Sequence, residues 1–246
     1  MKKIISTILV SIFVLLSAAS SVTALDMHLG YTGTITMRYK QTAEWYKDAF
    51  EFVSDYGAYL MKTTTYRIEY YTDSVDVYYR DFFGEREITR AEVATIVHRY
   101  DWHYDTHLSD RYKSSKCPAF SDVPDGKWMT PAVQWAADNG IVDGVGGDSF
   151  APNRTITREE FATIMYRYTE FKNVECDTTA DISSYPDSGE VSAWAKDAMA
   201  WAVGEGLISG KPGGLLAPQD TITRAEVALI VYRYNNNVLP HRDNKK

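Results

Sequence analysis

Three arginines that each follow a threonine carry the clearest binding chemistry in this sequence. They are Arg90, Arg158 and Arg224, in the segments "ITRAEVATIVHRY" (Ile88–Tyr100), "TITREEFATIMYRY" (Thr155–Tyr168) and "TITRAEVALIVYRY" (Thr221–Tyr234). Each is expected at the first position of a helix, where a cation is mildly unfavourable against the positive end of the helix dipole. Directed outward beside free N-terminal amides, each would form an anion-binding corner suited to a carboxylate. Pairing with a nearby acid, such as Asp122 or Asp187, is the alternative, and the spacing leaves both open.

The other residues of the repeated segment are explained by helix formation. A glutamate follows each threonine by three residues, which is the spacing of a capping box. The pairs are Thr89 and Glu92, Thr157 and Glu160, and Thr223 and Glu226. Apolar or aromatic residues at positions 1, 2, 4, 5 and 8 after each glutamate predict a broad buried helix face. We assign these positions to the fold.

A tryptophan segment precedes each of these helices. The three segments are "WYKDAFEFVSDYGAYLM" (Trp45–Met61), "WMTPAVQWAADNGIVDG" (Trp128–Gly144) and "WAKDAMAWAVGEGLISG" (Trp194–Gly210). The tryptophan and positions 4, 5 and 8 after it form an apolar stripe that predicts a first helix, ended by a glycine 12 residues after the tryptophan. The sequence therefore predicts three helix-loop-helix units, the last two offset by 66 residues.

The loops between the two helices differ among the units. The second and third run "GVGGDSFAPNRTIT" (Gly144–Thr157) and "GKPGGLLAPQDTIT" (Gly210–Thr223), with paired glycines and a proline. In the first unit, aromatic and β-branched residues flank Thr72–Ser74, which predicts an inserted β-hairpin within residues 63–87.

Other candidate chemistry is weak. His98, His103 and His107 lie near aspartates but lack a recognised metal-ligand spacing, so no metal site and no cofactor are predicted. No nucleophile motif is present. Cys117 and Cys176 each precede a unit, and a bridge between them and two isolated thiols both remain open.

The start of the chain predicts export. Residues 1–24 have two lysines, an apolar run from Ile4 to Leu16 and small residues before Ala24, as in a secretory signal peptide. The run is 13 residues long, shorter than the roughly 20 of a membrane-spanning helix. We expect a secreted product without a transmembrane segment after cleavage. Loss of the two lysines would change the net charge from −7 to −9, which argues against nucleic acid as a partner.

Residues Ala119–Tyr168 resemble an S-layer homology (SLH) domain. They contain, in the family's order, an aromatic-x-Asp-Val start, the Trp-x3-Ala-Val helix, a Gly-Ile-Val-x-Gly turn, a Phe-x-Pro loop and Ile-Thr-Arg-x-Glu-Phe-Ala. The third unit replaces the start with "SYPDSGEV", and the first unit lacks the start motif and the loop glycines, with Met61 in place of Gly144. We place SLH repeats at 36–104 (degenerate), 117–170 and 182–236, with a tail at 237–246.

The resemblance implies a mainly α fold, with three repeats in a pseudo-threefold bundle. It also implies noncovalent anchoring at the bacterial cell surface, by binding secondary cell wall polysaccharide with pyruvylated sugars in grooves between repeats. By matching position, Arg158, Arg224 and Arg90 would hold the acidic sugar. The loop glycines would let backbone amides approach the glycan; they are Gly144, Gly146, Gly147, Gly210, Gly213 and Gly214. Trp128 and Trp194 could stack on a sugar ring, although their place on the apolar stripe favours core packing.

Two other functions remain as alternatives to the anchor. A structural component of a surface lattice would self-associate without glycan. A wall-polysaccharide enzyme would need a pair of carboxylates, and the sequence presents no convincing pair, so we expect no enzyme. A second surface protein, bound through the hairpin of the first repeat, is a further candidate partner.

Overall fold

The computed structural model describes residues 22–29, 35–41, 48–49, 52–53, 61, 64–68, 77–81, 84–104 and 116–239. The chain divides into two units. One comprises Met1–Asp48 with Lys62–Phe82, and the other comprises Ala49–Met61 with Phe83–Lys246. Most of the expected signal peptide, the turn at Thr72–Ser74, Trp45, Gly57, His107 and the end of the tail lie outside the described residues.

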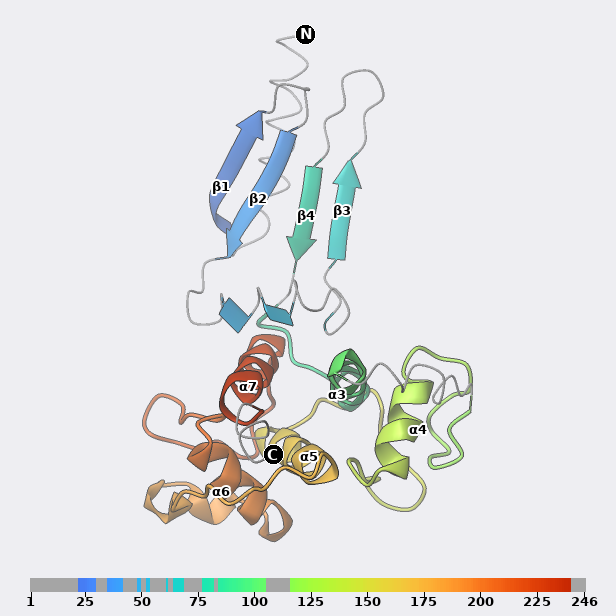
Figure 1. Ribbon diagram of the computed structural model, residues 1–246, viewed down its shortest axis with the longest axis vertical. Coiled ribbons are helices and arrows are strands. Elements are labelled where there is room, and N and C mark those ends of the chain that lie inside the picture. The colour runs from blue at the N-terminus through green and yellow to red at the C-terminus, as the bar shows by residue number, and fades with distance from the viewer. Residues whose placement is uncertain are drawn as a thin grey trace. The chain divides into compact units, whose positions relative to one another are not determined.

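In the part that comprises Met1–Asp48 and Lys62–Phe82, the described residues form two antiparallel strand pairs. β1 (Val22–Leu29) pairs with β2 (Ile35–Gln41), and β3 (Thr64–Ile68) pairs with β4 (Val77–Asp81). β3 and β4 lie within the segment 63–87, where the sequence predicts an inserted hairpin, and Tyr66 is opposite Tyr79. β1 and β2 were not anticipated (Figure 1). β1 begins at Val22, two residues before the expected cleavage site.

The part that comprises Ala49–Met61 and Phe83–Lys246 is helical, so the expectation of a mainly α fold is confirmed. Its helices are α3 (Arg90–Tyr104), α4 (Thr130–Asp138), α5 (Arg158–Phe171), α6 (Lys196–Gly204) and α7 (Arg224–Asn237). Three 3-10 turns, η3 (Ile182–Ser184), η4 (Ser188–Glu190) and η5 (Ala193–Ala195), precede α6. In Figure 1, α4 and α6 lie outside α3, α5 and α7, which are the helices of the three Thr-Arg segments. Within the described part of the chain, no helix is long and apolar enough to cross a membrane.

A closed ring of backbone hydrogen bonds relates the three inner helices. The N–H of Ile88 donates to the carbonyl of Ile222 (3.2 Å), Ile222 donates to Ile156 (3.1 Å), and Ile156 donates to Ile88 (3.1 Å). All three side chains are fully buried. Because each isoleucine precedes the arginine of its segment by two residues, the ring brings the starts of α3, α5 and α7 around one pseudo-threefold axis.

Three tyrosines repeat this symmetry further along the same helices. The ring centroids of Tyr100, Tyr168 and Tyr234 lie 5.9–6.1 Å apart, and all three rings are buried. The residue after each tyrosine belongs to a hydrogen-bond ring. Tyr100 donates to Asn235 (3.2 Å), Tyr168 donates to Asp101 (3.0 Å), and the hydroxyls of Thr169 and Tyr234 lie 3.3 Å apart.

The outer helices bury a different tryptophan from the one that the stripe suggests. Trp135 and Trp201 are 1% and 0% exposed, whereas Trp128 and Trp194 are 54% and 57% exposed. The expectation that the latter pair packs in the core is therefore wrong. The reason is that α4 and α6 each begin two residues after this tryptophan, so its side chain is not on the buried helical stripe. Both helices end before a glycine with positive φ (68° and 67°), as a left-handed C-cap requires.

Candidate functional site

The arginines at the helix starts are buried and reach into the neighbouring repeat. Arg90 donates from Nε to the carbonyl of Phe150 (2.9 Å), from Nη2 to the carbonyl of Asp143 (2.8 Å), and from Nη1 to Glu160 (3.3 Å). Arg158 makes the same three contacts one repeat later, with Leu216 (3.0 Å), Ser209 (3.1 Å) and Glu226 (3.0 Å). These two arginines are 5% and 4% exposed. Each therefore joins one repeat to the loop and the capping glutamate of the next.

Arg224 closes the cycle. It is 6% exposed, and its Nη1 lies 3.6 Å from Glu92 at the start of α3. Of the two alternatives for these arginines, the outward direction is thus wrong and pairing with an acid is present, although with capping glutamates and not with Asp122 or Asp187. The helix starts converge on the isoleucine ring, so the N1 side chain meets the adjacent helix-loop-helix unit. Burial lowers the pKa of each of these guanidinium groups, mainly because the charged form loses its contact with water.

Asp122 and Asp187 have another structural task than pairing with these arginines. Asp122 accepts hydrogen bonds from the amides of Phe150 and Ala151, both at 2.7 Å, and Asp187 does the same for Leu216 and Ala217. Ala151 and Ala217 have φ of 56° and 51°, which is unfavourable for a residue with a Cβ. The two aspartates thus hold equivalent loops in a tightly turned conformation.

The glutamates that cap the helices also form ion pairs with arginines. α5 and α7 each begin with a complete capping box, Thr157 with Glu160 and Thr223 with Glu226. At α3, the amide of Thr89 donates to Glu92 (3.0 Å), and the amide of Glu92 donates to the Thr89 hydroxyl (3.4 Å). Arg154 donates both Nη atoms to Glu160, and Arg86 does the same to Glu92. The third repeat has Asp220 at this position, so Glu226 lacks the equivalent arginine.

These contacts predict acid sensitivity. Burial by itself raises the pKa of Glu160, but Arg154 and the Thr157 amide outweigh it, so the pKa lies below its usual 4.5. A depressed folded-state pKa stabilises the protein above the unfolded pKa, and this stabilisation is lost as the pH falls through the folded value. We expect the free energy of unfolding to fall below about pH 5, and less steeply in Glu160→Gln. Urea unfolding at a series of pH values measures this; an identical pH slope in the variant would contradict it.

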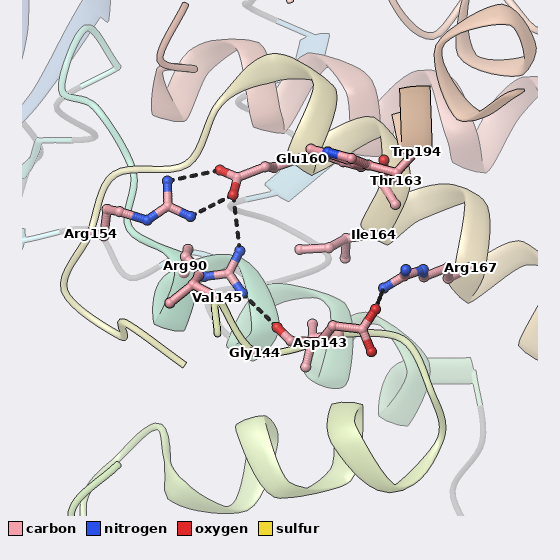
Figure 2. A pocket seen from close by; sticks show the side chains of 11 residues that line it. Arg90, Asp143, Gly144, Val145, Arg154, Glu160, Thr163, Ile164, Arg167 and Trp194 are labelled. Atoms are coloured by element: carbon pink, nitrogen blue, oxygen red, sulfur yellow. Dashed lines mark hydrogen bonds and ion pairs between the residues drawn. The ribbon is translucent and has the colours of Figure 1, made fainter. Parts of the chain in front are cut away.

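A cavity of about 470 Å³ lies where the repeats meet (Figure 2). Arg90 of α3 lines it together with the loop residues Asp143, Gly144 and Val145. α5 contributes Glu160, Thr163, Ile164 and Arg167, the preceding loop contributes Arg154, and η5 contributes Trp194. The cavity thus combines three arginines, three aliphatic side chains and one exposed indole. This volume lies in the range typical of small-ligand sites.

The structure gathers some of the predicted residues here and not others. Arg90, Gly144 and Trp194 share the cavity, whereas Arg158 occupies the equivalent boundary between the second and third repeats. A Cβ on Gly144 would lie 2.7 Å from the carbonyl of Ser149, so this glycine is needed to close its own loop. The remaining loop glycines, Gly146, Gly147, Gly213 and Gly214, have positive φ, and a Cβ on Gly210 would meet the Leu215 carbonyl at 3.2 Å.

Sequence reasoning missed Arg154, Arg167 and Asp143. The signal for Arg167 was visible, because an arginine stands nine residues after the first helical arginine in all three segments, at Arg99, Arg167 and Arg233. The signal for Arg154 was weaker, since only Arg86 matches it. Arg167 Nη1 lies 2.6 Å from a carboxylate oxygen of Asp143.

His98, Cys117 and Cys176 are not among the residues that line the cavity. His98 packs on Trp135 with ring centroids 5.0 Å apart, and burial lowers its pKa. Among the residues whose side chains are described, no group of three or more His, Cys, Asp or Glu could hold a metal ion. Cys117 and Cys176 are free thiols, so the structure contains two isolated thiols and no bridge between them. Burial raises the pKa of Cys176 to about 11, which keeps it a thiol at neutral pH.

Comparison with known proteins extends the likeness to named relatives. Exoglucanase XynX of Acetivibrio thermocellus is 38% identical over 113 residues, which are 46% of this chain and 10% of that protein. The surface-layer 125 kDa protein of Lysinibacillus sphaericus is 34% identical over 156 residues (62% and 12%). The cellulosome-anchoring protein of A. thermocellus is 30% identical over 152 residues (62% and 33%). The chain thus spans a third or less of each of these relatives.

The family comparison gives the same result for two segments of the chain. The model of the S-layer homology domain matches residues 119–162 and 184–228. The first segment runs from the start motif into α5, and the second runs from η3 into α7. The chain therefore carries S-layer homology sequence in its second and third helix-loop-helix units.

Proposed function

We propose that this protein attaches noncovalently to the bacterial cell envelope by binding an acidic wall polysaccharide in the grooves between its repeats. The observation that carries the proposal is the cavity formed by Arg90, Arg167 and Trp194, which come from three successive repeats. A groove of this composition offers charge-assisted hydrogen bonds to a carboxylate and a flat apolar face to a sugar ring.

The exposed tryptophans support recognition of a sugar. An indole that is 57% exposed leaves a large apolar face in water, and in this chain it borders a cavity instead of standing alone. Trp128 precedes α4 as Trp194 precedes α6, and it is 54% exposed. We infer that both indoles stack on glycan rings.

The first helix-loop-helix unit lies outside the residues that the family model matches. We propose that it is a degenerate repeat of the same kind, in addition to the two matched ones. Ile88, Thr89 and Arg90 take the same places around the axis as their counterparts in the other two repeats. Arg158 and Arg224 occupy equivalent helix starts, and we propose that each borders a further groove. Pyruvylated sugars are the proposed acidic component, and the protein is proposed to act outside the cell.

The names of the relatives agree with this role. A cellulosome-anchoring protein and a surface-layer protein each align with 62% of the chain. The exoglucanase aligns over only 10% of its own length, so its enzymatic name does not extend to this chain.

Sedimentation with purified cell-wall sacculi tests the proposal. The wild-type protein is expected to sediment with native sacculi and to stay in solution with sacculi stripped of secondary polysaccharide. Trp194→Ala is expected to weaken the binding about tenfold, because the stacking face is lost. Pro118→Ala, which also trims an exposed apolar side chain but lies outside the cavity lining and outside the glycine loops, is the control. Equal sedimentation with both sacculus preparations would refute glycan binding and favour self-assembly or a protein partner.

A further inference from the structure

One ion pair on the cavity wall is exposed to solvent. Arg167 Nη1 lies 2.6 Å from Asp143 Oδ2, and the two side chains are 32% and 71% exposed (Figure 2). The carbonyl of Asp143 is fixed by the buried Arg90, at 2.8 Å. The backbone of Asp143 is therefore held in place, while its carboxylate stands in solvent at the mouth of the cavity.

The other charges of the cavity are already committed. Glu160 accepts hydrogen bonds from both Arg90 and Arg154. Arg167, in contrast, has Asp143 as its ion-pair partner among the described residues. Of the three cations, Arg167 is thus the one whose partner is exposed enough to be exchanged. An exposed ion pair of this kind contributes little to stability, so exchanging it costs little.

The third repeat provides an internal comparison. Ser209 stands at the position of Asp143, and its carbonyl accepts from Arg158 at 3.1 Å, so the backbone contact is the same. Arg233 stands at the position of Arg167 and donates to the carbonyl of Leu207 at 3.1 Å. The protein therefore has one boundary where a carboxylate pairs with this arginine, and one where a serine stands at the carboxylate's sequence position.

We propose that Arg167 is the anchor for the carboxylate of an acidic sugar, and that Asp143 is an internal competitor that must be displaced for binding. This inference rests on the proposed function and concerns how the same cavity selects its ligand. A ligand carboxylate replaces one ion pair with another and is repelled by the displaced Asp143. Serine at this position removes both costs, so the boundary with Ser209 binds the acidic group more tightly.

Exchanging the two residues tests this. Isothermal titration calorimetry would use a monosaccharide that carries a pyruvate ketal. Asp143→Ser is expected to bind about fivefold more tightly at its site, and Ser209→Asp about fivefold more weakly at the other, the range expected for one exposed ion pair. Adding Arg167→Gln to Asp143→Ser should weaken binding about tenfold. Asp148→Asn is the control, because it removes a charge from the same loop outside the cavity lining.

The outcomes separate the two ideas. If the wild-type protein sediments with sacculi but Asp143→Ser binds the sugar no better than Asp148→Asn, the role of Asp143 as a competitor is overturned. Attachment of the protein to the cell wall then still stands. If neither the wild-type protein nor Asp143→Ser binds the sugar or sacculi, both ideas are overturned. Tighter binding by Asp143→Ser and weaker binding by Ser209→Asp would support the role of Asp143 as a competitor. Asp143 and Ser209 are both exposed, so neither substitution is expected to change folding.

Discussion

Replacing Arg158 with alanine is expected to lower the free energy of unfolding by about 3–5 kcal/mol. The guanidinium is 4% exposed and bonds to Leu216, Ser209 and Glu226 of the next repeat. Without it, two carbonyls and a largely buried carboxylate lose their partner, and an unpaired buried charge is strongly destabilising. Urea unfolding followed by circular dichroism measures this change.

Arg154→Ala is the matched control for that prediction. The Arg154 side chain is 42% exposed and also pairs with a capping glutamate, but it lies on the surface. We expect a loss of less than about 1 kcal/mol. Equal losses in Arg154→Ala and Arg158→Ala would contradict the role of Arg158 as a buried tie between repeats. Because Arg158→Ala disturbs folding, it is a poor test of glycan binding.

Replacing Asp101 with alanine is expected to cost about 3–5 kcal/mol as well. Asp101 is 0% exposed and accepts from the Tyr168 hydroxyl (3.0 Å) and from Lys172 Nζ (2.8 Å). Burial and the carboxylate of Asp101 raise the pKa of Tyr168 well above 10, so the hydroxyl keeps its proton to donate. The variant would leave that hydroxyl and the ammonium group of Lys172, whose side chain is 13% exposed, without their acceptor, which urea unfolding would detect.

Asp101→Asn separates the charge from the hydrogen bonds. Asparagine stands at the equivalent position of α7, as Asn235, where it accepts from Tyr100. One oxygen of Asp101, Oδ2, has no hydrogen-bond partner, so an amide could keep the bonded oxygen in place. We expect a smaller loss, about 1–3 kcal/mol. A loss as large as that of Asp101→Ala would show that the charge on Lys172 requires a carboxylate.

The repeated Thr-Arg-x-Glu segment acts as one connected structure. The threonine caps its own helix, and the glutamate returns the bond to the threonine amide. The arginine reaches the glutamate of the next repeat, from Arg90 to Glu160, from Arg158 to Glu226 and from Arg224 to Glu92. The three Thr-Arg-x-Glu segments are therefore joined in a ring, which explains why an arginine stands where the helix dipole disfavours it.

The local parts of this fold followed from the sequence because they depend on near neighbours. Thr157 and Glu160 are three residues apart, and Gly140 ends its helix by its own φ, so spacing alone indicated both features. The hairpin of β3 and β4 lies where turn residues separate two aromatic segments. The strands β1 and β2 were missed because residues 22–24 were assigned to a signal peptide and residues 36–41 to the first helix-loop-helix repeat.

The candidate site was harder to predict because its residues come from α3, α5, η5 and the loop after α4, which are far apart in the sequence. The direction of Arg90 depends on the Ile88–Ile156–Ile222 ring, which no local spacing reveals. The exposure of Trp194 depends on where α6 begins, and a shift of two residues takes the indole off the buried stripe. Asp143 and Arg167 are 24 positions apart in sequence and became neighbours only through the loop between them.

The most direct test of the central claim is the response of the tryptophan indoles to purified wall polysaccharide. The chain has six tryptophans, so its indole N–H signals can be resolved in a ¹H–¹⁵N spectrum and assigned by single Trp→Phe variants. If the cavity binds the glycan, the Trp194 signal shifts and saturates with added polysaccharide, while those of the buried Trp135 and Trp201 stay in place. Binding to the polysaccharide without any change at Trp194 would contradict the proposed site.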